Sequence, residues 1–197
     1  MDYRRAFVPG GSFFFTAVTE SRRPVFSTPE NVAVLREAMR RVKANHPLAI
    51  VATVILPDHL HAIWNLPPGD ADFSTRWRLV KTWFTKHCDR EKVPSECFLS
   101  PASALDVPGV RSRLAKAEQA VWQHRYWEHW LRDERDFARH LDYLHYNPVK
   151  HGWVTHPIDW PYSSFRHFVK RGIYTEDWGS SLSPDLDGTE EYAELDK

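Results

Sequence analysis

The segment VILPDHLHAIWNLP, residues 54–67, carries two histidines one residue apart inside a hydrophobic run. Successive side chains of an extended strand point to opposite faces, so His59 and His61 share one face while Leu60 and Ala62 point to the other. Two imidazoles side by side can bind one divalent metal ion. Two partly buried histidines at a strand end would give the same pattern, so the pair by itself leaves both interpretations open.

A tyrosine lies beside the apolar side of a second segment, DERDFARHLDYLHYN at 133–147. A helix over this segment has an apolar arc that consists of Phe137, Leu141, Leu144 and Pro148. Tyr143 lies about 100° from the centre of that arc. We therefore expect its ring at the flank of the helix with its hydroxyl in water, as is common for a lone tyrosine.

Strands and helices must position these residues. The hydrophobic pattern predicts strands at 12–19, 48–56, 60–66 and 121–131 and helices at 28–46, 74–89 and 133–147. Thr28 and Pro29 suit the N-cap and the first position of the first helix. The turn Pro57-Asp58 joins two strands and places the histidines at the start of the second one.

The order β-α-β-β-α-β-α predicts an α+β fold of the ferredoxin-like type, an antiparallel sheet with helices packed on one face. A histidine pair that faces those helices would be costly unless it bound a ligand or faced an opening. We expect one domain over residues 1–179. Residues 91–120 are rich in Pro and Ser and predict an inserted loop with a short helix at 111–120, and residues 180–197 form a tail without a pattern.

Composition limits the class of protein. The 197 residues are 42% hydrophobic and 14% aromatic, enough for one good core. A net charge of zero argues against a protein that is basic throughout, although a local basic patch is compatible with it. No apolar run is long enough to span a bilayer, the N-terminus lacks a signal peptide, and two cysteines form no disulfide framework, so we expect a cytoplasmic protein.

Three further segments accompany the histidine pair and the tyrosine. LPDHLHAIW and HLDYLHYNPVKHGWV occur with YRRAFVPGGSFFFTAV, DFSTRWRLVKTWFTK and DWPYSSFRHFVKRGIYTEDW. Together they resemble the HUH single-tyrosine transposases, and within them the REP-associated tyrosine transposases, which act on palindromic repeats as single-stranded hairpins. The resemblance covers nearly the whole chain and departs at 91–120 and after Gly179.

The resemblance implies a fold of the HUH endonuclease type and a role for each motif residue. His59, His61 and Asn147 would bind a divalent ion, Mg²⁺ or Mn²⁺, and Tyr143 would attack DNA. The partners would be single-stranded DNA hairpins, with no membrane, and a monomer is favoured. A phosphotyrosine linkage keeps the energy of the broken bond, so the strand can be rejoined without ATP.

The residues around Asn147 allow a second interpretation. Asn147 precedes Pro148, and Asn-Pro is also the pattern of an N-cap followed by a first helical residue. NPVKHG could therefore begin a separate turn that ends at Gly152. As a cap, the Asn147 side-chain oxygen would accept from a backbone N–H and would not face a metal ion.

Cations and aromatic residues are expected to bind the DNA strand. We expect contacts from Arg4 and Arg5 before the first strand and from Arg76, Arg78 and Lys81 on the second helix, with some of the nine tryptophans as stacking platforms. Each of these residues could instead be a solvated charge or a core aromatic.

Two other functions stay open at this point. The chain could be a nucleic-acid-binding module that has lost cleavage, or a metal-dependent phosphodiesterase that activates water. A covalent protein–DNA adduct distinguishes the transposase from both. A zinc site from His87, Cys88 and Cys97 is a weaker hypothesis, since their spacing matches no standard ligand set.

Overall fold

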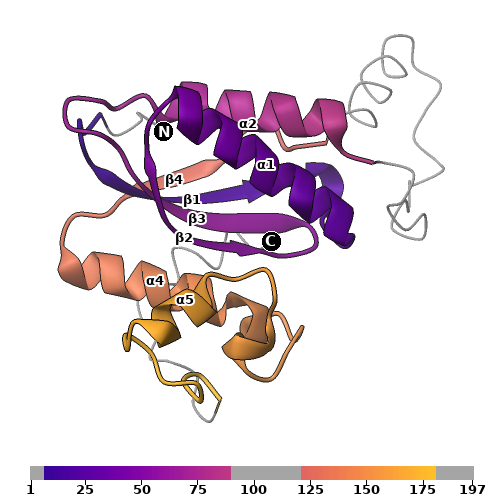
Figure 1. The fold of residues 1–197 in the computed structure, drawn as a ribbon, viewed down its shortest axis with the longest axis vertical. Coiled ribbons are helices and arrows are strands. Elements are labelled where there is room, and N and C mark those ends of the chain that lie inside the picture. Colours follow the sequence, from indigo (N-terminus) through magenta and orange to yellow (C-terminus); the bar gives the residue numbers. More distant parts are fainter. Residues whose placement is uncertain (1–6, 90–120, 181–197) are drawn as a thin grey trace, which may run out of the picture.

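A four-stranded sheet forms the centre of the molecule (Figure 1). The computed structural model describes residues 7–89 and 121–180. The strands are β1 (Ser12–Val18), β2 (Ala49–Ile55), β3 (His59–Asn65) and β4 (Trp127–Trp130), and the longer helices are α1 (Pro29–Asn45), α2 (Phe73–His87) and α4 (Glu134–Lys150), followed by the short α5 (Phe165–Lys170).

The strands lie in the order β2-β3-β1-β4, and every neighbouring pair is antiparallel. A hairpin joins β2 to β3, and β1 then pairs with β3 so that Val18 lies opposite His59 and Thr16 opposite His61. The predicted α+β class with an antiparallel sheet is confirmed. The histidine-bearing strand is thus an inner strand, paired on both sides.

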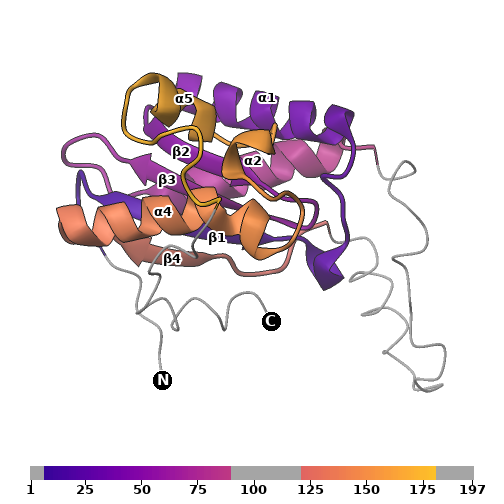
Figure 2. The ribbon, with the colours of Figure 1, turned by 90° about the horizontal axis from the view of Figure 1, so that it is seen from below.

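Helices cover both faces of the sheet, and in this respect the expectation of one covered face was wrong (Figure 2). Phe13 and Phe15 of β1 pack in a core with α1 and α2, whereas Phe14 packs in a second core with α4 and α5. The apolar run Phe13–Phe15 explains this arrangement, because a strand that is apolar at consecutive positions must be buried on both faces.

Most element boundaries agree with the sequence pattern. Thr28 caps α1 by accepting from the backbone N–H of Asn31, with Pro29 as the first helical residue. Asp72 and Asp133 accept in the same way at the starts of α2 and α4. The predicted last strand is shorter than expected, since only Trp127–Trp130 pairs continuously with β1 and Trp122 forms an isolated bridge to Thr19.

The end of α4 decides between the two interpretations of Asn147. The helix continues through Pro148 to Lys150, so Asn147 is an interior residue and not the N-cap of a separate turn. Pro148 is tolerated there because it removes one hydrogen bond close to the C-terminus. Gly152 ends the helix with φ +70°, and its N–H donates to the carbonyl of Val149.

Residues 1–6, 90–120 and 181–197 lie outside the described residues. The predicted inserted loop at 91–120, its short helix at 111–120 and the C-terminal tail at 180–197 therefore stay predictions. Within the described residues, no helix is long and apolar enough to cross a membrane.

Candidate functional site

His59 and His61 point from β3 toward α4, on the face opposite α1 and α2. Their neighbours Leu60 and Ala62 lie in the core under α1 and α2, so the predicted alternation is confirmed. Both imidazoles are buried, with 2% and 0% exposure. The site is therefore built inside the molecule and not at a strand end open to water.

A hydrogen bond orients each of the two rings. His59 Nδ1 lies 2.6 Å from the Asp58 carboxylate, which also accepts from Arg22 at 3.0 Å. His61 Nδ1 lies 2.9 Å from the hydroxyl of Thr16 on β1. When Nδ1 is engaged in this way, Nε2 is the atom left to bind a metal ion, and its ring is held in one orientation.

Burial and nearby charges favour a neutral His61 and an ionised Asp58. Burial would raise the pKa of Asp58, but the hydrogen bonds and charges of His59 and Arg22 outweigh burial and lower it to about 2. Burial, and then the repulsion that positive charge on neighbouring groups would exert, holds the pKa of His61 well below its usual value. Neutral imidazole is the form that binds metal ions.

Asn147 on α4 completes the group around the histidines. Its Oδ1 lies 3.3 Å from His59 Nε2. Among the described residues, His61 Nε2 and Asn147 Nδ2 are buried and have no hydrogen-bond partner. Two imidazole nitrogens and one amide oxygen are donors that a divalent ion such as Mn²⁺ or Mg²⁺ accepts, and the unpaired His61 nitrogen fits such a ligand.

Tyr143 lies in the core and not at the water-exposed flank that its helical position suggested. The side chain is 2% exposed, and its ring meets the His61 ring edge-on at a centroid distance of 5.4 Å. Lys150 approaches it from one end, with Nζ 3.4 Å from the phenol oxygen and 4.8 Å from the ring centroid. The apolar arc underestimated the burial of Tyr143 because its ring faces the sheet, where Phe14 of β1 and His61 of β3 lie against it.

Four further residues belong to this site and were not predicted from the sequence. Asp58 and Thr16 orient the histidines, Lys150 contacts Tyr143, and the His151 ring lies 5.1 Å from the His59 ring. Lys150 follows Tyr143 by seven residues, a spacing that returns to the same side of a helix. The sequence therefore contained a signal for Lys150, which lies in NPVKHG. It contained none for Thr16, because that residue meets His61 only through the pairing of β1 with β3.

A second group of possible metal ligands lies near the start of α4. Asp136 contacts His129 Nε2 at 3.0 Å and His140 Nδ1 at 3.0 Å, and it also accepts from the backbone N–H of Arg132. The two imidazole rings are stacked 4.5 Å apart at 18°. Because a metal ion lies in the plane of each imidazole that binds it, these rings would have to rotate to share one. As placed, His129 joins β4 to α4 through its hydrogen bond to Asp136, and His140 Nδ1 lies 2.7 Å from the carbonyl oxygen of Asp136 within α4.

Arg76 is buried, whereas the predicted DNA contact needs an exposed side chain. Its side chain is 5% exposed and bridges α2 to the start of β2. The guanidinium donates to the Asp70 carboxylate and to the carbonyls of His46, Pro47 and Asp72. These acceptors occupy the guanidinium and hold the loop before α2.

The other predicted DNA contacts have different environments. Lys81 donates to the carbonyl of Gln123 at 3.1 Å and lies over the rings of Trp122 and Tyr126, and burial lowers its pKa to about 8. Arg78 is exposed on α2. Arg4 and Arg5 lie outside the described residues, as does Cys97 of the proposed zinc set.

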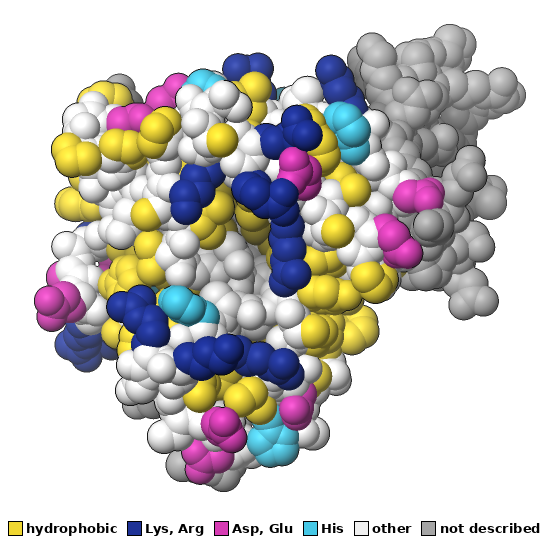
Figure 3. Space-filling model, in the orientation of Figure 1, with side chains coloured by type: hydrophobic (Ala, Val, Ile, Leu, Met, Phe, Trp, Pro, Cys, Tyr) yellow, Lys and Arg dark blue, Asp and Glu magenta, His cyan; other side chains and the backbone are white. Residues whose placement is uncertain are grey.

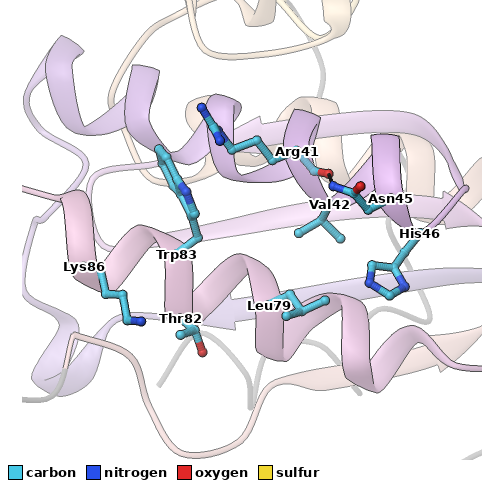
Figure 4. A pocket seen from close by; sticks show the side chains of 8 residues that line it. All are labelled: Arg41, Val42, Asn45, His46, Leu79, Thr82, Trp83 and Lys86. Atoms are coloured by element: carbon cyan, nitrogen blue, oxygen red, sulfur yellow. Dashed lines mark hydrogen bonds between the residues drawn. The ribbon is translucent and has the colours of Figure 1, made fainter.

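A shallow groove of about 350 Å³ separates α1 and α2 on the face of the sheet away from the histidines (Figure 4). Trp83 and Leu79 of α2 face Val42 of α1 across it, and Arg41 lies 5.3 Å from the Trp83 ring centroid. The groove contains none of the predicted site residues. The sheet lies between the groove and the group of His59, His61, Tyr143 and Asn147.

Comparisons with known proteins agree on one family. The chain is 39% identical over 182 residues to the REP-associated tyrosine transposase of Escherichia coli strain K12, covering 92% of this chain and 93% of that one. A Haemophilus influenzae protein named for the same transposase is 41% identical over 185 residues, covering 94% and 96%. A solved REP-associated tyrosine transposase bound to a REP hairpin is 38% identical with a TM-score of 0.73 over 95% of each chain. No protein-family model matches the chain.

The contrast between Arg76 and Arg78 gives a prediction for stability. We expect Arg76→Ala to lower the free energy of unfolding by about 3 kcal/mol, because it leaves Asp70 and three carbonyls without their donor. Arg78→Ala, on the same helix but exposed, should stay within about 0.5 kcal/mol of wild type. Urea unfolding followed by tryptophan fluorescence measures both. Equal effects of the two variants would contradict a structural role for Arg76.

Proposed function

This chain belongs to the REP-associated tyrosine transposase family, and on that premise we propose that it cuts and rejoins single-stranded DNA through a covalent bond to Tyr143. The observation that carries the proposal is the contact of the Tyr143 ring with His61, whose Nε2 is unpaired among the described residues, while Lys150 lies at the phenol oxygen.

The proposed step exchanges one phosphodiester for another. The Tyr143 oxygen attacks the scissile phosphorus, the bond from phosphorus to the leaving DNA oxygen breaks, and that oxygen leaves as a hydroxyl after taking up a proton. The reverse attack by a DNA hydroxyl restores the strand and frees Tyr143. No co-reactant is consumed, since the bond count is the same on both sides.

Lys150 supports Tyr143 as the nucleophile. A phenol has a pKa near 10 in water, so the proton must leave or be shared as attack proceeds. A cation 3.4 Å from the phenol oxygen stabilises the negative charge that develops there. Lys150 is exposed on its outer side, so a phosphate can approach the pair from solvent.

His59, His61 and Asn147 would hold the divalent ion that the family implies. Bound there, the ion would polarise the scissile phosphate and neutralise charge in the transition state. The chain prepares these ligands in advance. Asp58 and Thr16 fix the two rings, and burial keeps His61 neutral, so little reorganisation accompanies binding.

The DNA substrate follows from the comparison. The related transposase of known structure binds a REP hairpin. We propose that this chain also acts on hairpins of palindromic repeats, with the cut in the single-stranded part beside the stem. The buried site supports a single strand as the reacting part, since a duplex is too wide to reach Tyr143 between α4 and the sheet.

Replacing the nucleophile tests the covalent step. We expect Tyr143→Phe to abolish the covalent adduct with a labelled single-stranded hairpin in Mg²⁺ or Mn²⁺, while hairpin affinity stays within about threefold of wild type because only one oxygen is lost. Tyr146→Phe, on the same helix, is the control and should form the adduct. Wild-type cleavage without an adduct would favour a phosphodiesterase, and binding without cleavage would favour a binding module.

Removing a ligand or its support should weaken metal binding by different amounts. We expect His61→Ala to lower Mn²⁺ affinity more than about 100-fold, and Thr16→Val, which removes only the hydrogen bond to His61, to lower it about 10-fold. Isothermal titration without DNA measures both, and the exposed His156→Ala is the control. If His61→Ala binds Mn²⁺ as tightly as wild type, the ion is held elsewhere.

Neutralising Lys150 should slow the chemical step. We expect Lys150→Met, which keeps the chain length but removes the charge, to reduce the single-turnover rate of adduct formation about 10- to 100-fold at saturating DNA. Lys86→Met, at the end of α2 and away from the catalytic group, should leave the rate unchanged. A normal rate for Lys150→Met combined with weaker DNA binding would assign Lys150 to binding alone.

A further inference from the structure

Positive charge gathers on one face of a molecule whose net charge is zero. Lys and Arg side chains lie over α1 and again over the C-terminal segment at α5, on either side of the strip over β2 (Figure 3). On α1, Arg36, Arg40 and Lys43 are exposed and recur with the spacing of one helical face. They form a row that runs about 10 Å along the helix.

A second row belongs to α5. Arg166 and Lys170 are exposed one turn apart, and Arg171 follows directly after the helix. Residues 165–171 contain no acidic residue, and within the described residues neither Lys170 nor Arg171 forms an ion pair. The row therefore keeps its positive charge available to a ligand.

The edge of the sheet runs between the two rows. β2 is an outer strand of the sheet, with α1 on one face and α5 on the other (Figures 1 and 2). Residues 162–164 pair with the later half of β2, through hydrogen bonds at Thr53 and Ile55. Arg36 lies 5.5 Å from the Tyr162 ring centroid, so this segment also connects the α1 row to the α5 side.

We propose that these two rows bind the duplex stem of the DNA hairpin, one row to each phosphate backbone. We call this surface the β2 cradle and define it as Arg36, Arg40 and Lys43 on α1 with Arg166, Lys170 and Arg171 on the α5 side. The proposal rests on the proposed function for its choice of DNA. Two separate cationic rows fit the two backbones of a duplex better than they fit a single strand, which has one.

Dimensions and position both support this ligand. Phosphates along one strand of a duplex advance about 3.4 Å each, so the α1 row matches about three of them. β2 pairs directly with β3, so a stem on the cradle lies about one strand spacing from the strand that carries His59 and His61. A single strand that leaves the stem there has a short path to Tyr143.

Ion pairs with Glu37 reduce the contribution that some cations of the α1 row can make to DNA binding. It forms ion pairs with Arg40 and Arg41 and so neutralises part of the α1 row. Arg166 donates to the carbonyl of Ile158 and has a structural contact as well. Lys43, Lys170 and Arg171, with Arg36, whose contact with the Tyr162 ring is a weak surface cation–π contact, are therefore the residues whose removal tests the cradle with least disturbance of the fold.

The test measures how salt affects DNA binding. In a Tyr143→Phe background, the variant Arg36→Ala, Lys43→Ala, Lys170→Ala, Arg171→Ala is titrated by fluorescence anisotropy at several salt concentrations. The probes are a synthetic DNA hairpin with a ten-base-pair stem and an unstructured single strand of the same length. We expect the slope of log affinity against log salt for the hairpin to fall by about 3 and its affinity at 150 mM salt to fall about 100-fold.

A matched control removes the same charge elsewhere. Lys86→Ala, Arg132→Ala, Arg135→Ala, Arg139→Ala takes four exposed cations from α2 and from the start of α4, and it should change the slope by less than about 1. Equal losses in the two variants, or equal losses for the hairpin and the single strand, would overturn the cradle. Wild-type protein that binds the hairpin through these residues but forms no adduct would instead refute the covalent function and leave the cradle intact.

Discussion

Burial of two imidazoles on an inner strand is the constraint on which the rest of the site depends. His59 and His61 are removed from water on a face where Val, Ile or Leu would be expected, so each nitrogen needs a partner. Asp58 and Thr16 satisfy one nitrogen of each ring, and Arg22 in turn holds Asp58. The second nitrogen of each ring, Nε2, is directed toward α4, where His59 lies beside Asn147 and His61 beside Tyr143. In the proposed function a bound metal ion would offset the remaining cost of burying these two nitrogens.

The position of α4 follows from the same requirement. Tyr143, Asn147 and Lys150 lie on one side of the helix, and Phe14 of β1 contacts both His61 and Tyr143 from below. Because the helix continues past Pro148, Lys150 stays on that side and reaches the phenol oxygen. A helix that ended at Asn147, as the Asn-Pro pattern also allowed, would not place Lys150 there.

The local pattern predicted the strands, the capped helices and the shared face of the histidines, because these depend on periodicities of two and 3.6 residues. It failed where the outcome depends on the assembled fold. The sequence placed Arg76 and Lys81 on the second helix but did not indicate their contacts: Arg76 donates to Asp70 and three carbonyls, and Lys81 lies over Trp122. Tyr143 appeared exposed because the strands that bury it, with Phe14 of β1 and His61 of β3 against its ring, lie far from it in the sequence. The two cationic rows lie far apart in the sequence, on α1 and at α5, and only the folded sheet brings them to the two sides of β2.

The exposures within the site indicate how DNA reaches it. Tyr143, Asn147 and both histidines are at most 2% exposed, whereas Lys150 is exposed and His151 is partly so. The site therefore opens toward solvent at the C-terminal end of α4, beside the 3-10 turn Pro157–Asp159. Trp160 follows that turn and donates to the carbonyl of Ile55 at the end of β2. In the proposed reaction, a strand that passes the end of β2 would meet Lys150 before Tyr143, so the cation that would stabilise the phenolate would also be the first to contact the phosphate.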